Sequence, residues 1–227
     1  MLRDRIAEVE ARIRRAAERA GRRPEEVTLI AVTKRFPPSL IREAYHVGLR
    51  RFGENYVQEF EGKLSGLADL TEARYHLIGH LQSNKAKRAA QLFDVIETVD
   101  SARLARRLDE VPAELRRSRA GPLEVLLEVK LSGEEAKSGA APEELNALVE
   151  AVRACPSLEL TGLMTMPPWS EDPEASRPYF RGLRELAEGL GLRKLSMGMS
   201  HDLEVAIEEG ATEVRVGTAL FGPRAAR

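Results

Sequence analysis

A lysine stands at the end of a short apolar run near the start of the chain. The run, residues 27–34 (VTLIAVTK), is rich in β-branched residues and has the character of a buried strand. An amine at the carboxyl end of such a strand loses solvent, which lowers its pKa and frees its lone pair for attack on a carbonyl carbon. Lys34 is therefore a candidate for Schiff-base formation. The alternative is a lysine that pairs with a carboxylate in a structural role.

Two later segments are rich in small residues and have the composition of a phosphate site. Gly198 and Ser200 follow one apolar run, and Gly217 and Thr218 follow another. Small residues let backbone amides approach an anion closely, and Ser200 begins a predicted helix whose amino end attracts negative charge. In the alternative interpretation, Ser200 is an ordinary helix cap and Gly217 allows tight packing.

A reactive lysine and a phosphate site on one face would suit a phosphorylated aldehyde. Pyridoxal 5′-phosphate (PLP) offers both groups, an aldehyde for Lys34 and a phosphate for the backbone amides. An aldolase that uses Lys34 without PLP is a further alternative, but it leaves the phosphate site unexplained.

These residues meet only if the chain folds into parallel strands whose carboxyl ends converge. Segments with strand and helix periodicity alternate along the chain. Strands are predicted over residues 27–34, 49–53, 75–80, 95–99, 124–129, 158–164, 194–198 and 213–217. Helices are predicted over residues 2–20, 39–47, 55–68, 83–92, 101–110, 142–154, 174–189 and 201–209.

Strict alternation of strand and helix implies parallel strands with helical crossovers. Eight evenly spaced units predict a closed (β/α)₈ TIM barrel in a single domain over residues 1–227, and an open doubly wound sheet is the alternative. Few residues follow the eighth strand, so we expect the first helix, residues 2–20, to cover the gap in the outer layer.

Composition narrows the classes of function. A formal net charge of −1 indicates no large electrostatic attraction to nucleic acid or to an anionic membrane. No apolar stretch has the length of a membrane span, and the amino terminus has no signal-peptide core. The single cysteine, Cys155, forms no intrachain disulfide, which is typical of a reducing compartment. We therefore expect a cytoplasmic protein, and a monomer because no strong apolar stripe is evident.

Several longer motifs carry a resemblance to a known family. They are residues 33–34 (TK), 52–59 (FGENYVQE), 76–85 (HLIGHLQSNK), 162–164 (GLM), 195–200 (LSMGMS) and 214–222 (VRVGTALFG). In this order they resemble the YggS/PROSC family, the PLP homeostasis proteins. The resemblance implies an alanine racemase-like barrel of PLP fold type III, without the C-terminal β domain of the racemases. It also implies that PLP is held as a Schiff base on Lys34.

The resemblance assigns further roles by position. Ser200, Gly217 and Thr218 would hold the phosphate, and Arg215 would face the pyridine nitrogen. Asn55 and His80 would line the ring and its phenolic oxygen. Met164 would pack on a ring face, with a methionine of the barrel core as the alternative. No catalytic residue and no metal ligand are expected.

Three positions need separate comment. The family often has a small residue where His201 stands and an asparagine where Lys130 stands, so polar details of the rim differ here. Lys137 matches a family lysine and is a candidate for a second, surface PLP acceptor; the alternative is a solvated charge.

The expected function is holding the cofactor rather than using it. An arginine at the pyridine nitrogen keeps that nitrogen unprotonated, which makes the ring a weak electron sink. Alanine racemases also need a second base, a tyrosine of their extra domain, and this chain ends soon after the eighth strand. We expect a protein of PLP homeostasis that buffers PLP or supplies it to apo PLP-dependent enzymes. A small one-base amino-acid racemase is the alternative.

Overall fold

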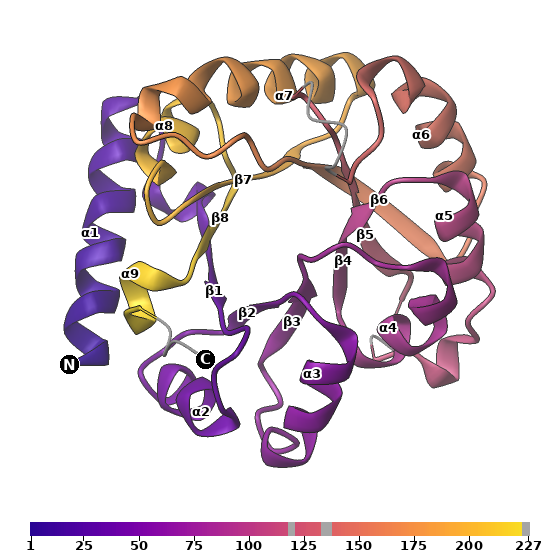
Figure 1. Ribbon diagram of the computed structural model, residues 1–227, viewed down its shortest axis with the longest axis horizontal. Coiled ribbons are helices and arrows are strands. Elements are labelled where there is room, and N and C mark those ends of the chain that lie inside the picture. The colour runs from indigo at the N-terminus through magenta and orange to yellow at the C-terminus, as the bar shows by residue number, and fades with distance from the viewer. Residues whose placement is uncertain (118–120, 133–137, 224–227) are drawn as a thin grey trace.

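The protein is a closed barrel of parallel strands surrounded by helices (Figure 1). The computed structural model describes residues 1–117, 121–132 and 138–223. Each strand pairs in parallel with the next one in the sequence, and β8 returns to pair with β1. The prediction of a TIM barrel is confirmed, and the open doubly wound sheet is wrong.

The observed elements follow the predicted alternation. The strands are β1 (Thr28–Val32), β2 (Arg51–Glu54), β3 (Arg74–Leu77), β4 (Val95–Val99), β5 (Leu123–Glu128), β6 (Leu158–Met164), β7 (Lys194–Met199) and β8 (Glu213–Val216). The helices are α1 (Leu2–Arg19), α2 (Pro38–His46), α3 (Val57–Lys63), α4 (Ala86–Leu92), α5 (Ala102–Asp109), α6 (Leu145–Arg153), α7 (Arg177–Leu190), α8 (Leu203–Glu208) and α9 (Thr218–Phe221). The short 3₁₀ turns Ser83–Lys85, Pro142–Glu144 and Pro173–Ser176 lead into α4, α6 and α7.

The predicted helix 55–68 is shorter in the structure, and the departures that bear on the site lie just after the strands. β1 ends at Val32, so Lys34 lies in the turn that follows the strand. α8 begins at Leu203 with Asp202 as its N-cap residue, so the prediction that Ser200 begins this helix is wrong. The carboxylate of Asp202 instead accepts a hydrogen bond from the amide of Met199, which closes a turn around Ser200.

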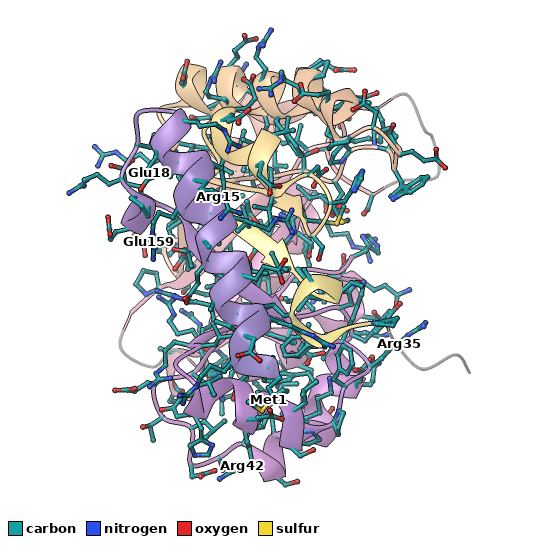
Figure 2. The ribbon with its side chains drawn as sticks, turned by 90° about the vertical axis from the view of Figure 1, so that its left-hand side faces the viewer. Met1, Arg15, Glu18, Arg35, Arg42 and Glu159 are labelled. Atoms are coloured by element: carbon teal, nitrogen blue, oxygen red, sulfur yellow. The ribbon has the colours of Figure 1, made fainter. Side chains whose placement is uncertain are left out.

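The first helix closes the outer layer of the barrel. α1 packs against α8 and α9 and buries Ile6, Val9 and Ile13, as the sequence predicts (Figure 1). Figure 2 views the molecule from this side, with Arg35 at one end of the barrel and Glu159 at the other. Among the described residues, none of the helices combines the length and apolar character that crossing a membrane requires.

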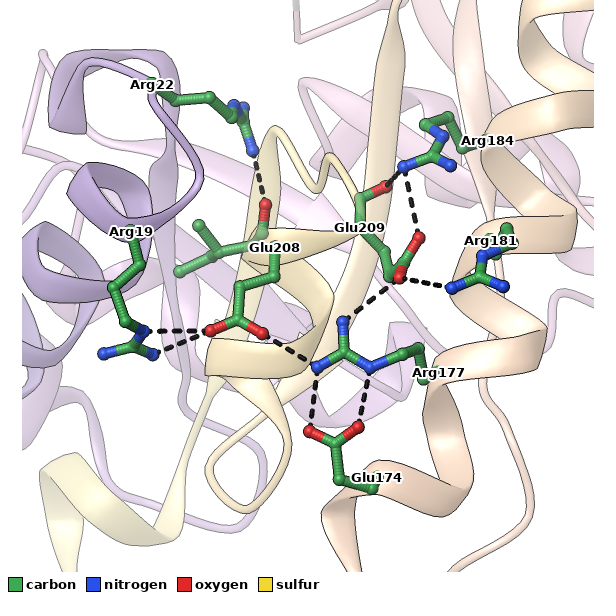
Figure 3. Close-up of polar contacts among 9 residues, drawn as sticks. Arg19, Arg22, Glu174, Arg177, Arg181, Arg184, Glu208 and Glu209 are labelled. Atoms are coloured by element: carbon green, nitrogen blue, oxygen red, sulfur yellow. Dashed lines mark hydrogen bonds and ion pairs between the residues drawn. The ribbon is translucent and has the colours of Figure 1, made fainter.

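Ion pairs tie α1, α7 and α8 together on the surface (Figure 3). Glu208 binds Arg19 of α1 and Arg177 of α7. The Glu209 carboxylate lies 3.1–3.2 Å from guanidinium nitrogens of three arginines of α7, namely Arg177, Arg181 and Arg184. Burial alone would raise the pKa of Glu209, but the hydrogen bonds and charges of these arginines outweigh it and lower the pKa.

We expect Glu209→Gln to lower the free energy of unfolding by about 2 kcal/mol, because it removes the charge that three arginines share. A carboxyl group with a lowered folded-state pKa stabilises the fold above its unfolded pKa, and this contribution is lost as the pH falls through the folded pKa. The difference between wild type and variant should therefore shrink in acid. Urea unfolding at pH 7 and below pH 4 measures both effects.

Glu174→Gln is the matched control, because Glu174 is more exposed and, in the part of the chain that the structure describes, forms an ion pair with Arg177 alone. Equal losses of stability in the two variants would contradict the special role of Glu209.

Candidate functional site

A cavity of about 220 Å³ opens at the carboxyl ends of the strands. Its polar lining includes six of the residues that the sequence and the family resemblance nominate. They are Lys34, Asn55, Ser200, Arg215, Gly217 and Thr218. The amine, the arginine and the small-residue loops therefore face one space, as the proposed ligand would require.

Two nominated residues lie elsewhere. His80 lines a neighbouring cavity of about 390 Å³, which shares Asn55 with the first, and its Nδ1 lies 3.5 Å from the carboxylate of Asp100. Met164 is fully buried in a small cluster with Val95 and Leu126. For Met164 the structure favours the alternative of a barrel-core methionine.

Met166 and Trp169 supply apolar lining that the sequence analysis did not identify. Met166 lies two residues beyond the end of β6, as Lys34 lies two residues beyond the end of β1. This spacing was the available signal, since a residue just past the carboxyl end of a strand can reach the mouth of the barrel.

The loops after β7 and β8 lie against one another. The Ser200 hydroxyl accepts a hydrogen bond of 3.3 Å from the amide of Ala219. The end of β7 requires glycine, because Gly198 has a φ of +91° and a Cβ there would lie 2.4 Å from the Cβ of Ala206. α9 begins at Thr218, and its next amides are already bonded, Ala219 to the Ser200 hydroxyl and Leu220 to the carbonyl of Gly217. The Ser200 hydroxyl and the first turn of α9 thus lie together at one edge of the cavity.

A buried chain of polar side chains fixes Arg215 beneath the cavity. Its guanidinium donates to the Ser196 hydroxyl at 2.6 Å and to the Thr165 carbonyl at 2.9 Å. Ser196 in turn donates to Glu97 at 2.5 Å, and the other carboxylate oxygen of Glu97 lies 2.7 Å from His76 Nδ1. Arg215 is therefore oriented from inside the barrel and independently of any ligand.

The charged side chains of this hydrogen-bonded series, His76, Glu97 and Arg215, are all buried. Burial raises the pKa of Glu97, but the hydrogen bond and charge of His76, the charge of Arg215 and Ser196 outweigh burial and lower the pKa. Burial lowers the pKa of Arg215, and the neighbouring Glu97 opposes that shift. Glu97 was missed by the sequence analysis, although a lone carboxylate in the apolar strand 95–99 was a visible signal.

Asn55 offers a direct test of whether a polar ligand fits. Its side-chain oxygen Oδ1 is buried and has no hydrogen-bond partner among the described residues. The close passage of the next strand end holds Asn55 in place, because a Cβ on Gly79 would lie 2.3 Å from the Asn55 carbonyl oxygen. A buried acceptor without a partner is costly, so this position suits a ligand with a hydrogen-bond donor.

The remaining positions of interest lie at the rim or outside the described residues. His201 lines the cavity but is exposed, and its Nε2 lies 2.9 Å from the Glu171 carbonyl oxygen. Lys130 pairs through its backbone amide with Ala140. Lys137, the candidate second acceptor, lies outside the described residues.

The fold defines the class of protein. The barrel of an alanine racemase from Clostridium difficile 630 superposes with a TM-score of 0.72 over 99% of this chain and 57% of its own, at 12% sequence identity. A family model described as "Alanine racemase, N-terminal domain" matches residues 5–225. The structure is thus a racemase-type barrel.

Relatives with higher sequence identity identify the family within this class of barrel. A protein of Pseudomonas aeruginosa named "Pyridoxal phosphate homeostasis protein" is 52% identical over 222 residues, which cover 96% of this chain and 94% of that protein. PipY of Synechococcus elongatus, whose structure was solved with PLP bound, is 38% identical, with a TM-score of 0.84 over 98% of this chain and 100% of its own. The chain belongs to the family of pyridoxal phosphate homeostasis proteins, which confirms the resemblance identified in the sequence.

We expect Glu97→Gln to lower the free energy of unfolding by about 3 kcal/mol, because it leaves two buried basic side chains, His76 and Arg215, without their carboxylate. Ser196→Ala is the control, since it removes one hydroxyl and should cost about 1 kcal/mol. Urea unfolding of both variants at pH 7 measures the difference. A loss in Glu97→Gln no greater than in Ser196→Ala would contradict the proposed electrostatic role.

Proposed function

We propose that this protein binds PLP in the cavity at the carboxyl end of its barrel and acts in PLP homeostasis. The observation that carries this proposal is the convergence of Lys34, Arg215 and the loops around Ser200 and Thr218 on one cavity. The names of the close relatives and the PLP-bound structure of PipY support it.

The geometry supports a role for each of the six convergent residues. Lys34 would form the Schiff base, and Ser200, Gly217 and Thr218 would hold the phosphate. Arg215 would face the pyridine nitrogen, and the unpartnered oxygen of Asn55 would accept a hydrogen bond from a donor on the ligand. We leave out His80 and Met164, because neither lines this cavity.

The same residues favour a protein that binds PLP over an enzyme that uses PLP to convert a substrate. Bound PLP supplies an aldehyde for the amine and a conjugated ring that withdraws electrons. That ring is a strong electron sink only when its nitrogen is protonated, and a guanidinium, which carries no acceptor, does not favour the protonated form. Arg215 would therefore weaken the sink while fixing the ring in place.

We further propose that the protein works in the cytoplasm as a monomer and passes PLP to apo PLP-dependent enzymes. A formal net charge of −1 and a single cysteine, which is buried, support this setting. The cavity mouth supports exchange, because the side chain of Trp169 at its edge is 75% exposed.

We expect the protein mixed with PLP to develop the visible absorbance of a protonated Schiff base, and Lys34→Ala to lose it, because Lys34 supplies the amine. Borohydride reduction followed by peptide mass analysis should place the adduct on Lys34. Lys85→Ala is the matched control, since Lys85 lines the neighbouring cavity and should leave the band intact. An undiminished band in Lys34→Ala would refute the assignment of the site.

The PLP-loaded protein should restore activity to an apo PLP-dependent enzyme, because a Schiff base on an open site is reversible. The borohydride-reduced protein, in which PLP is fixed covalently, is the control and should restore nothing. Enzyme activity against time measures the transfer. Equal recovery with both samples would argue against transfer, and exchange of the α-proton of L-alanine for deuterium faster than with free PLP would indicate an enzyme.

A further inference from the structure

The turn that carries Lys34 has an unfavourable backbone conformation. The amide of Phe36 donates to the carbonyl of Thr33 at 3.0 Å and closes the turn over residues 33–36. Arg35, at its third position, has a φ of +65°, and it is the single non-glycine residue with a positive φ in the described part of the chain. This conformation costs an ordinary residue on the order of 1 kcal/mol, so other contacts must hold the turn in place.

Those contacts converge on the buried lysine of α3. The ammonium of Lys63 lies 3.0 Å from the Thr33 carbonyl oxygen, 2.7 Å from Glu54 and 2.8 Å from Glu59, and its side chain is 7% exposed. An ammonium has three N–H donors, and each finds an acceptor here. Lys63 is therefore fully committed to this cluster.

The cluster forms hydrogen bonds to the backbone on both sides of Lys34. Before it, the carbonyl of Thr33 binds Lys63, and the Thr33 hydroxyl donates to Glu54 at 2.7 Å. After it, the amide of Arg35 donates to Glu59, which also binds Lys63. The two backbone groups that flank Lys34 are thus fixed to one set of charges.

Stability alone does not account for such a cluster. Buried ion pairs often contribute little to the free energy of folding, because desolvation of the charges offsets their attraction. Burial raises the pKa of Glu54 even against Lys63 and Thr33, which shows that desolvation is substantial here. The charged side chains form directional hydrogen bonds to the Thr33 carbonyl and the Arg35 amide, which apolar side chains could not form.

We propose that Lys63 is a positioning residue, which together with Glu54 and Glu59 locks the turn so that the amine of Lys34 faces the cavity. This inference rests on the proposed function, because the amine matters only if Lys34 binds PLP. That the cluster holds residues 33–36 in place does not depend on PLP and can be tested without it.

The test replaces the cluster without leaving a lone buried charge. The double variant Lys63→Met/Glu54→Gln removes both buried charges and keeps an acceptor for the Thr33 hydroxyl. Its matched control is Lys194→Met/Glu124→Gln, which removes an ion pair at the opposite, amino end of the barrel, where β7 begins. Both proteins are purified free of PLP, and urea unfolding measures their stability.

Two measurements then separate positioning from stability. Hydrogen–deuterium exchange of the peptide containing residues 33–36, in the PLP-free protein, should be at least tenfold faster in the Lys63 variant and unchanged in the control. The rate at which added PLP forms its Schiff-base absorbance should fall at least tenfold in the Lys63 variant alone. If the double variant does not fold, Glu59→Ala provides the same readouts, because it removes the partly exposed carboxylate that binds the Arg35 amide and leaves the pair of Lys63 and Glu54 intact.

The inference would be overturned if a folded Lys63 variant exchanged the amides of residues 33–36 at the wild-type rate. It would also be overturned if that variant formed the Schiff base at the wild-type rate. A failure of the proposed function is distinguishable, because wild type would then form no Schiff base on Lys34. In that case the exchange measurement alone decides whether Lys63 holds the turn.

Discussion

The interior of a closed barrel excludes water, so a charge placed there is costly unless an opposite charge or hydrogen bonds compensate it. This constraint organises the whole molecule from the amino end to the mouth. At the amino end, Glu124 binds Lys194 and Arg74. Half-way up, Glu97 binds His76 and, through Ser196, reaches Arg215. Because that last pairing ends at the floor of the cavity, the need to neutralise buried charge also fixes the guanidinium that lines the cavity.

Closure of the barrel creates the candidate site. β1 and β8 are the strands farthest apart in the sequence, yet they pair in parallel with Ile30 opposite Arg215. The turn after β1 and the helix after β8 therefore meet, and the rings of Phe36 and Phe221 pack with their centroids 5.3 Å apart. An amine from one end of the chain and small-residue loops from the other become neighbours for this topological reason. An open sheet with the same sequence motifs would leave them on separate edges.

The sequence predicts those parts of the site that depend on local pattern. An apolar run that ends in Lys34 and a run followed by Gly217 and Thr218 identify strand ends, and the parallel alternation places those ends on one face. The sequence did not show which side chain near the end of a strand lines the cavity. Met164 is the last residue of β6 and points into the core, whereas Met166 reaches the cavity.

Other features had no local signature. Strands buried on both faces lose the alternation that would distinguish inward from outward residues, so the link from Glu97 to Arg215 was invisible in the sequence. In the sequence, Lys63 is an ordinary charge within the predicted helix 55–68, and only packing of α3 against the turn after β1 reveals its partners. Long-range polar contacts of this kind depend on the assembled fold, which no periodicity encodes.

The distribution of carboxylates bears on what the site can do. A protonated pyridine nitrogen needs a carboxylate beside it, and Glu97 is a deeply buried carboxylate near the cavity floor. Its two oxygens are already engaged by His76 and Ser196, and the guanidinium of Arg215 lies beyond Ser196 on the side of the cavity. A carboxylate of α3, Glu59, binds the turn beside Lys34 rather than entering the cavity. Under the proposed function, the buried charges therefore position the amine and the arginine, and neither of these two carboxylates is left to stabilise a proton on the ring nitrogen. That arrangement suits a protein that captures PLP and releases it again.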